Sequence, residues 1–498
     1  MANCLILYGR TGAIAHSKNA GPFRIATELR KNGYSVRCID ITVFDDPITL
    51  GRALKNLIDK DTLWVGISGT FLFDIFGFEW QRLVNKDAEL PNNDAGLLQF
   101  INFVKSLNPN IKFITGGSRK HHLAKYGFIN FEGYVDQKIV DYTNWLSKKH
   151  TNVNLEFYSN VIKNKEYDDF YSSNILFELE DIVFANEALP IEISRGCIFK
   201  CKFCSFPLNG KAKGEGMRDP EILKAEFIRN YELFGTTNYT FADDTYNDSI
   251  EKITTLYEKV YSKLPFKINF TTYARLDLMM RFPESIDIMK KSGLKSVVFG
   301  IETLNPKSAK TIGKGIDPKE QIKFIRQIKN DQWADVMTSS GFILGLPHHT
   351  DDDLNYIQDW IFSDDNPLDH WHIDPLHLSP PDIVDQQYSY SELDTDYKKY
   401  GYKIIVDPTQ HLHNQVRWVN ENTGLTQEKC SDIAANLMTK SYSHKKYRAG
   451  SFGFPEVAEF LDSDTVLKTP VSDYASLFST WRDEKKEQYI TRLFESFK

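Results

Sequence analysis

The stretch IEISRGCIFKCKFCSFPLNGK, residues 191–211, decides the fold. A short strand-like segment, IEIS, runs directly into a loop that carries Cys197, Cys201 and Cys204 in the spacing CxxxCxxC. Parallel α/β sheets and barrels place their chemistry in loops that follow the carboxyl ends of strands. Three thiolates in one loop can hold three irons of a four-iron cluster and leave the fourth iron open to another ligand. The loop therefore predicts a reactive iron–sulfur centre with these three cysteines as ligands.

A structural zinc site is the alternative for the same cysteines. Zinc in structural sites takes four ligands and favours paired CxxC motifs. No fourth Cys or His lies in this loop. The iron–sulfur interpretation is therefore preferred to zinc and to simple buried thiols.

Strand and helix patterns alternate around this loop, from residue 190 to about residue 381. Six strands are expected, at residues 191–194, 238–244, 267–275, 295–302, 336–345 and 370–379. Helical patterns fill the intervals, at about 220–235, 249–264, 283–293, 317–332 and 350–363. Six βα units in succession predict a partial (βα)6 TIM-like barrel whose site lies at the carboxyl ends of its strands.

A second α/β pattern occupies residues 1–150. Its apolar strands are expected at residues 4–9, 35–41, 62–70, 112–117 and 128–133. Amphipathic helical stretches separate them, which predicts a doubly wound, Rossmann-like domain with a ligand site at the strand carboxyl ends. Residues 151–189 are expected to be a linker, and residues 382–498 a small, mostly helical cap.

Composition excludes several classes of protein. The chain has 498 residues, of which 41% are hydrophobic, too many for intrinsic disorder. Its formal charge of −7 offers no global basic field for nucleic acid or an anionic membrane. No stretch approaches the 18 or so apolar residues of a membrane span. We expect a cytoplasmic protein with reduced cysteines, no membrane partner and no nucleic acid partner.

The motif CxxxCxxC, with Phe203 just before its last cysteine, resembles the signature of the radical S-adenosylmethionine (SAM) enzymes. This resemblance covers the barrel, from about residue 190 to 380. Segments such as GPFRIATELRKNGYSVRCIDI and LWVGISGT resemble the cobalamin-binding-type domain that precedes the barrel in one large subgroup. The resemblance implies a 4Fe-4S cluster, reductive cleavage of SAM to methionine and a 5′-deoxyadenosyl radical, and an electron donor such as flavodoxin or ferredoxin.

The resemblance also implies residues that contact SAM. Asp243 or Asp244, in FADD, stands where the family has a GGE-type motif that contacts the methionine amino group. The departure from GGE leaves open which carboxylate serves, and capping of the following helix is the alternative. Glu302, in GIE, resembles the acid that contacts the ribose.

Two further segments are candidates for the SAM site. Arg275, in YARLD, is a candidate donor to the SAM carboxylate, with a plain surface salt bridge as the alternative. The segment GFILGLP resembles the GxIxGxP element that packs against adenine. There Gly341 and Gly345 would permit close approach of the backbone, and Pro347 would fix the exit turn.

The segment HWHID supplies the candidate catalytic residues. Alternation along a strand places His370, His372 and Asp374 on one face. If that face is the inside of the barrel, His372 and Asp374 are positioned to relay protons or to anchor substrate. If it is the outer face, they are surface residues. The other histidines considered, His348, His349, His411 and His413, are expected to lie on the surface.

The substrate is a small molecule, lipid precursor or peptide that the sequence does not identify. Cobalamin is permitted but not required, because the DxHxxG motif that supplies a lower histidine ligand is missing. Methylation is the expected reaction with cobalamin, and rearrangement, cyclisation or oxidation without it. The alternatives are a tRNA methylthiotransferase-like enzyme and an iron–sulfur or zinc module without catalysis.

Overall fold

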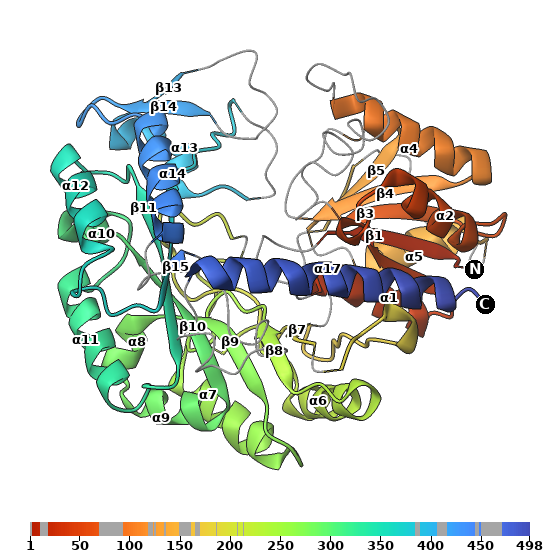
Figure 1. Ribbon diagram of the computed structural model, residues 1–498, viewed down its shortest axis with the longest axis horizontal. Helices are drawn as coiled ribbons and strands as arrows, with labels where there is room; N and C mark the ends of the chain where they lie inside the picture. Colours follow the sequence, from red (N-terminus) through yellow and green to blue (C-terminus); the bar gives the residue numbers. More distant parts are fainter. Residues whose placement is uncertain are drawn as a thin grey trace. The chain divides into compact units, whose positions relative to one another are not determined.

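The computed structural model divides the chain into two compact units (Figure 1). Unit 1 joins the amino-terminal residues as far as Ala185 to Ser479–Lys498, and unit 2 extends from Asn186 to Phe478. The structure describes residues 2–9, 18–68, 93–117, 123, 126–133, 136–148, 161–164, 170–185, 187–206, 208–212, 214–383, 389–405, 416–443, 448–449 and 471–498. Among these residues, no helix is both long and apolar enough to cross a membrane.

Unit 1 is built on a six-stranded parallel sheet of order β2-β1-β3-β4-β5-β6. Its strands are β1 (Cys4–Tyr8), β2 (Val36–Asp40), β3 (Trp64–Ser68), β4 (Lys112–Gly117), β5 (Phe128–Gly133) and β6 (Val161–Asn164). Its helices are α1 (Ala20–Lys31), α2 (Pro47–Leu57), α4 (Asn93–Leu107), α5 (Asp136–Leu146) and most of α17 (Val471–Glu495). The doubly wound prediction is confirmed, and β6 adds a strand inside the expected linker.

The alternation of apolar residues along β1 explains how both faces of this sheet are covered. Leu5 and Leu7 point into a core formed with α2, α4 and the end of α17. Tyr8 points the other way and packs edge-on against Phe23 of α1. The strand order reverses beside β1, so the carboxyl ends of β1 and β3 form the switch point where such sheets bind ligands. The loops that follow these two strands, 10–17 and 69–92, lie outside the described residues.

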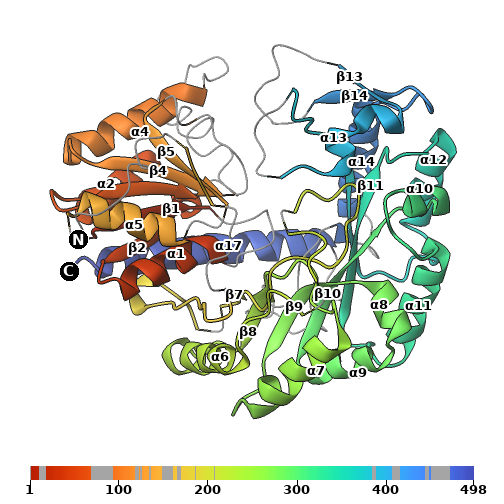
Figure 2. The same cartoon turned by 180° about the vertical axis from the view of Figure 1, so that it is seen from behind.

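Unit 2 is built on a seven-stranded parallel sheet of order β15-β12-β11-β10-β9-β8-β7 (Figure 2). Its strands are β7 (Leu189–Ile191), β8 (Asn238–Phe241), β9 (Asn269–Ala274), β10 (Leu294–Glu302), β11 (Met337–Leu344), β12 (His370–Pro375) and β15 (Arg448–Ala449). The helices of the repeats are α6 (Pro220–Phe234), α7 (Ile250–Lys259), α8 (Leu276–Arg281), α9 (Glu284–Lys291), α10 (Pro306–Thr311), α11 (Pro318–Asn330) and α12 (Asp351–Trp360). The six expected strands and the partial barrel are confirmed, and the short β15 extends the sheet at one edge.

The two faces of this sheet differ in chemistry. Phe299 stacks on Trp333, and Phe342 packs edge-on against Trp360 of α12, so these strand positions face the helices. Alternate positions face inward and are smaller and more polar, such as Ser296, whose hydroxyl donates to Thr271 (2.6 Å). The inner face is therefore suited to a polar ligand.

The region after the barrel is less helical than expected. It contains α13 (Glu392–Thr395) and α14 (Gln427–Ser443), but also the antiparallel pair β13 (Tyr402–Ile405) and β14 (Arg417–Asn420). Residues 479–498 belong to unit 1, because Tyr489 and Leu493 complete its core. The finer domain limits at residues 150, 189 and 381 stay predictions.

Candidate radical SAM site

The cysteine loop begins directly after β7 and folds back on itself. Gly196 adopts a left-handed φ of +78°, and a Cβ there would lie 2.7 Å from the Leu208 carbonyl oxygen. Only glycine fits this close approach. The Cys197 amide donates to the Leu208 carbonyl (3.2 Å), and the Gly210 amide donates to the Cys197 carbonyl (2.7 Å). The backbone of the loop is thereby fixed before any ligand binds.

Each cysteine sulfur lies beside a polar side chain of unit 2, and Cys197 Sγ also lies 3.5 Å from the Phe199 amide nitrogen. The pairs are Cys197 with Thr245 Oγ1 (3.1 Å), Cys201 with Arg275 Nη1 (3.3 Å) and Cys204 with Asn209 Nδ2 (3.1 Å). Hydrogen bonds of this kind orient sulfur ligands and tune the metal that they hold. Burial raises the pKa of the Cys204 thiol, so its thiolate needs the positive charge of a bound metal.

The donor set of this loop fits an iron–sulfur cluster. Its three thiols are the ligand type that such clusters use. In the part of the chain that the structure describes, no three His, Cys, Asp or Glu side chains lie close enough together to hold a single metal ion. A four-iron cluster binds each thiolate through a different iron, so its ligands do not need to converge on one point.

The two aspartates of FADD have different surroundings. Asp243 is buried and accepts hydrogen bonds from the Ile193 amide (2.8 Å), the Ser194 amide (3.1 Å) and the Ser194 hydroxyl (2.8 Å). Its oxygens therefore join the end of β8 to the end of β7. Asp244 is only half-buried and accepts from the Gly196 amide (3.0 Å). Of the two, Asp244 remains the candidate for the SAM amino group, and that role stays a prediction.

Burial, together with the neighbouring Asp243 carboxylate, raises the pKa of Asp244 to about 6. Neither aspartate caps the next helix, because the cap of α7 is Ser249, which accepts from the Lys252 amide (3.1 Å). The capping alternative is therefore wrong.

The guanidinium of Arg275 contacts other protein side chains through each of its nitrogens and through its flat face. Its Nε and Nη2 donate to the two carboxylate oxygens of Asp277 (2.9 and 2.5 Å), and its guanidinium lies 3.7 Å from the centre of the Phe199 ring. An ion pair is thus present, as the alternative expected, but Arg275 is buried and not on the surface. Because Nη1 approaches Cys201, Arg275 acts first on the cysteine loop. Its contact with SAM stays a prediction.

Glu302 ends β10 in a strained conformation. Its φ of +67° lies in the left-handed region, which is rare for residues other than glycine and is found at functional sites. Lys314 Nζ lies 3.2 Å from Glu302 Oε1 and donates to the Gly300 carbonyl (2.8 Å). A Cβ at Gly300 would come within 2.7 Å of that carboxylate oxygen, and a Cβ at Gly341 would lie 3.9 Å from the other. The carboxylate therefore lies over two glycines on the inner face, and its contact with ribose stays a prediction.

Lys314 connects Glu302 to the cysteine loop. Its ammonium lies 5.4 Å from the centre of the half-buried Phe203 ring, within range of a cation–π contact. The Lys202 amide also donates to the Ile312 carbonyl (3.0 Å), so the segment after α10 packs on the loop. The structure thus brings Phe203, Glu302 and Gly341 together. Lys314 was not among the expected residues, because nothing in its local sequence distinguishes it from other lysines.

The GFILGLP turn packs against protein at Gly345. This residue has a φ of +82°, and a Cβ there would lie 2.8 Å from Trp418 Cζ2 and 3.0 Å from Cys430 Sγ. The Tyr402 hydroxyl donates to its carbonyl (2.6 Å). Tight packing against the β13–β14 region therefore explains this glycine without any ligand. A role toward adenine stays a prediction for Gly341 and Pro347.

Two of the histidines expected on the surface are described. His349 is buried, so that expectation is wrong: its ring nitrogens contact the Gly345 amide (3.2 Å) and the Thr303 hydroxyl (2.7 Å). His348 is half-buried. His411 and His413 lie outside the described residues.

His372 and Asp374 lie together on the inner face of β12. They pair in register with Gly341 and Ile343 of β11, and His372 Nε2 is hydrogen-bonded to Asp374 Oδ2. Their side chains are 40% and 47% exposed, whereas His370 is buried. The hydrogen bond to Asp374 raises the pKa of His372. Their catalytic roles stay predictions.

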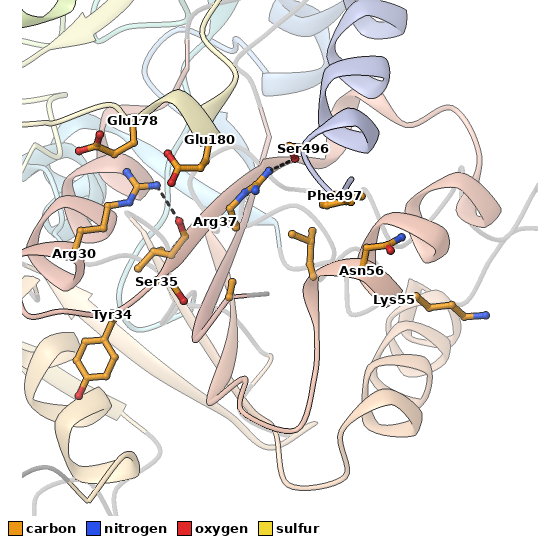
Figure 3. Close-up of a pocket in the computed structure, with 13 residues that line it drawn as sticks. Arg30, Tyr34, Ser35, Arg37, Lys55, Asn56, Glu178, Glu180, Ser496 and Phe497 are labelled. Carbon is orange, nitrogen blue, oxygen red and sulfur yellow. Dashed lines mark hydrogen bonds between the residues drawn. The ribbon is translucent and has the colours of Figure 1, made fainter. Parts of the chain in front are cut away.

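Unit 1 contains a separate cavity of about 730 Å³ (Figure 3). It lies beside Ala2 and Val36, at the amino-terminal ends of β1 and β2, opposite the edge where doubly wound sheets bind ligands. Its charged lining mixes both signs: Arg30, Arg37, Lys55, Glu178 and Glu180. None of the predicted site residues lines it.

Comparison with known proteins identifies the class. Residues 191–361 match the Radical SAM superfamily, so unit 2 carries a radical SAM domain. Over 162 residues the chain is 28% identical to an uncharacterized methyltransferase of Pyrococcus horikoshii, covering 32% of this chain and 34% of the relative. The chain thus spans about a third of the length of the curated relatives it matches.

Solved structures share the fold over a longer range. The radical SAM methyltransferase TsrM from Kitasatospora setae, with cobalamin and a 4Fe-4S cluster bound, aligns over 100% of both chains with a TM-score of 0.59 and 13% identity. The cobalamin-dependent SAM radical enzyme OxsB, with aqua-cobalamin bound, aligns over 86% of this chain and 58% of its own, with a TM-score of 0.53 and 17% identity. At these identities the likeness establishes the fold alone: a doubly wound domain followed by a partial TIM-like barrel.

Proposed function

We propose that this protein is a radical SAM enzyme that uses a 4Fe-4S cluster on Cys197, Cys201 and Cys204 to cleave SAM and methylate a small molecule or peptide. One observation carries the proposal. The three cysteines follow β7 of a radical SAM domain, and each sulfur has its own polar neighbour. Methylation is favoured over other outcomes because the relatives in sequence and structure include proteins named as methyltransferases.

The residues at the mouth of the barrel would bind and orient SAM. When bound, a reduced cluster supplies one electron to the SAM sulfonium through its open iron. Asp244 would accept a hydrogen bond from the SAM ammonium, and Glu302 would accept from the ribose hydroxyls. The absence of a Cβ at Gly300 leaves room for the Glu302 carboxylate and for the Lys314 ammonium that pairs with it.

Cobalamin would bind in unit 1, at the carboxyl ends of β1 and β3. The strand order of this sheet and the cobalamin-bound structures with the same fold support this assignment. The cofactor would supply a carrier for the methyl group. An electron donor such as flavodoxin or ferredoxin would provide the reducing electron.

Anaerobic reconstitution of the full chain tests the proposal. We expect about four irons and four sulfides per chain, with SAM turnover after reduction. Cys201→Ala should abolish both, because it removes one of only three thiolates. Cys430→Ala is the matched control, since Cys430 is also a free thiol but lies against Gly345 and should leave both unchanged. One zinc per chain without SAM cleavage, or cleavage that survives Cys201→Ala, would contradict the proposal.

Glu302→Ala separates SAM binding from cluster assembly. Loss of a hydrogen bond to a charged acceptor costs about 1.5–3 kcal/mol, so SAM should bind at least roughly tenfold more weakly. The iron content should stay at the wild-type level, because Glu302 is not a ligand. Equilibrium dialysis of labelled SAM with the reconstituted protein measures the change. Unchanged affinity would remove Glu302 from the site.

A further inference from the structure

We infer that Lys252 is a positioning residue for the iron–sulfur cluster: it ties the cysteine loop to the end of β8 and favours reduction of the cluster. The inference rests on the proposed function. It concerns a buried lysine–aspartate network, made of Ser194, Lys211, Asp243, Asp248 and Lys252. None of the motifs that define the class contains Lys252, which lies in the first turn of α7.

Lys252 is at the centre of this network. Its ammonium donates to the Ser194 hydroxyl (2.6 Å) and to the Thr245 carbonyl (3.2 Å). It also forms ion pairs with Asp243 (3.3 Å) and Asp248 (3.4 Å), and its side chain is only 4% exposed. Lys252 thus touches the last residue before the cysteine loop, Ser194, and both aspartates that neutralise its charge.

Lys211 extends the network to the far end of the loop. Its ammonium lies 3.2 Å from Asp248 Oδ2 and donates to the carbonyls of Arg195 and Glu215 (2.9 Å each). Asp248 therefore bridges the two lysines. Since Arg195 precedes the three cysteines and Lys211 follows them, the network fixes both ends of the segment that carries all three ligands.

The buried network is stable only when all four charged side chains are present. Two lysines and two aspartates balance in charge, and all four side chains are nearly buried. Breaking a buried ion pair by removing one partner is strongly destabilising, because it leaves an uncompensated charge. Asp243 keeps its three hydrogen bonds from Ile193 and Ser194 when Lys252 is removed, but it loses the cation that balances its carboxylate. Removal of Lys252 therefore leaves a net negative charge beside the loop.

A short path links this charge to the cluster. Lys252 donates to the carbonyl of Thr245, and the hydroxyl of Thr245 lies 3.1 Å from Cys197 Sγ. A reduced cluster carries one more electron than an oxidised one, so a nearby cation stabilises the reduced form, more strongly in a buried site than in water. Lys252 should therefore make the cluster easier to reduce.

The experiment compares full-length, anaerobically reconstituted variants by iron content and by the midpoint potential from an EPR-monitored redox titration. For Lys252→Met we expect a roughly tenfold lower ratio of reduced to oxidised cluster at a given potential. For a one-electron couple this equals a midpoint potential about 59 mV more negative than that of wild type. Lys252→Arg keeps the charge and should stay closer to wild type. The matched control is Lys329→Met, because Lys329 also pairs with an aspartate, Asp369 (2.7 Å), and a backbone carbonyl, that of Val336 (3.0 Å).

Each outcome decides between the two proposals. A wild-type protein that assembles no cluster overturns the proposed function and this inference with it. If the wild-type protein assembles a cluster but Lys252→Met has the same midpoint potential, this inference alone is overturned. An equal shift of the midpoint potential in Lys329→Met overturns it too.

If Lys252→Met does not fold, Ser194→Ala provides the test, because it removes only the hydroxyl between Asp243 and Lys252. It should lose iron to a chelator faster than wild type, and an unchanged rate would overturn the inference.

Discussion

The tautomer of His349 is determined by its two hydrogen-bond partners. The Gly345 amide donates to Nδ1 (3.2 Å), so the ring proton resides on Nε2 and points to Thr303 Oγ1 (2.7 Å). Burial lowers the pKa of His349 to about 4. A proton on Nδ1 would displace the Gly345 amide, so the GFILGLP turn depends on a neutral imidazole at this position.

This histidine predicts a loss of stability in mild acid. Its pKa is lower in the folded protein than the ordinary value of about 6.5, so the unfolded chain binds a proton first as the pH falls. The contribution of neutral His349 to the free energy of unfolding is fully present above pH 6.5. As the pH falls from about 6.5 to about 4, the free energy of unfolding decreases by about 2–3 kcal/mol. Urea unfolding followed at several pH values measures it. His349→Gln should show a shallower acid dependence than wild type, and parallel curves would refute the assignment.

The aspartates of FADD show what could not be predicted at the scale of single residues. The motif position indicated that one of the pair faces SAM, but two adjacent carboxylates in a loop look alike in sequence. Asp243 is distinguished by its partners in the fold: Ile193 and Ser194, about 50 residues earlier in the chain, and Lys252 of the next helix. Similarly, Gly345 was expected to accommodate adenine, whereas Trp418 is its neighbour in the fold. Long-range packing, which local patterns do not encode, decides such cases.

At the scale of elements, α17 is the clearest departure from expectation. Its residues Tyr489 and Leu493 are buried in the core of unit 1, and the Tyr489 hydroxyl accepts from the Asp40 amide of β2 (3.2 Å). Lys486 of the same helix pairs with Asp45 (2.6 Å). Each of these contacts spans more than 400 residues of sequence, so no short-range pattern could reveal them.

Leu493→Ala tests the attachment of this helix. Truncation of a fully buried leucine costs about 2–5 kcal/mol, and the cost should fall on unit 1. Native-state hydrogen exchange measures it, with faster exchange expected at the amides of β1 and unchanged exchange at those of β10. Gln488→Ala, an exposed position on the same helix, is the control. Equal loss of protection in both strands would show that the units unfold together.

Strands proved easier to predict than connections. The strands of both sheets carry short apolar runs bounded by turn residues, a pattern that is typical of buried parallel strands. The sixth strand of unit 1, β6, has the sequence VIKN and lies in a polar stretch, so it resembled a linker. The seventh strand of unit 2, β15, has only two residues, too few for any periodicity.

At the scale of the whole molecule, the sequence was sufficient for the architecture and for the class. Eleven strand patterns and one cysteine motif predicted a doubly wound domain and a radical SAM barrel, which the structure and the comparisons confirm. The supporting lysines were not predictable. Lys252 contacts Ser194, and Lys314 contacts Glu302. From sequence alone a lysine on a helix or loop is expected on the surface, because its buried partners are distant in the chain.

The composition of unit 1 has a consequence for its biosynthesis. Its sheet is synthesised before unit 2, whereas the part of α17 that completes the core around Leu5 and Leu7 follows about 290 residues after Ala185. At about 5–20 residues per second, roughly 15–60 seconds pass in between. During that interval the core of unit 1 lacks the side chains of Tyr489 and Leu493, so the unit cannot complete its packing until unit 2 has been synthesised.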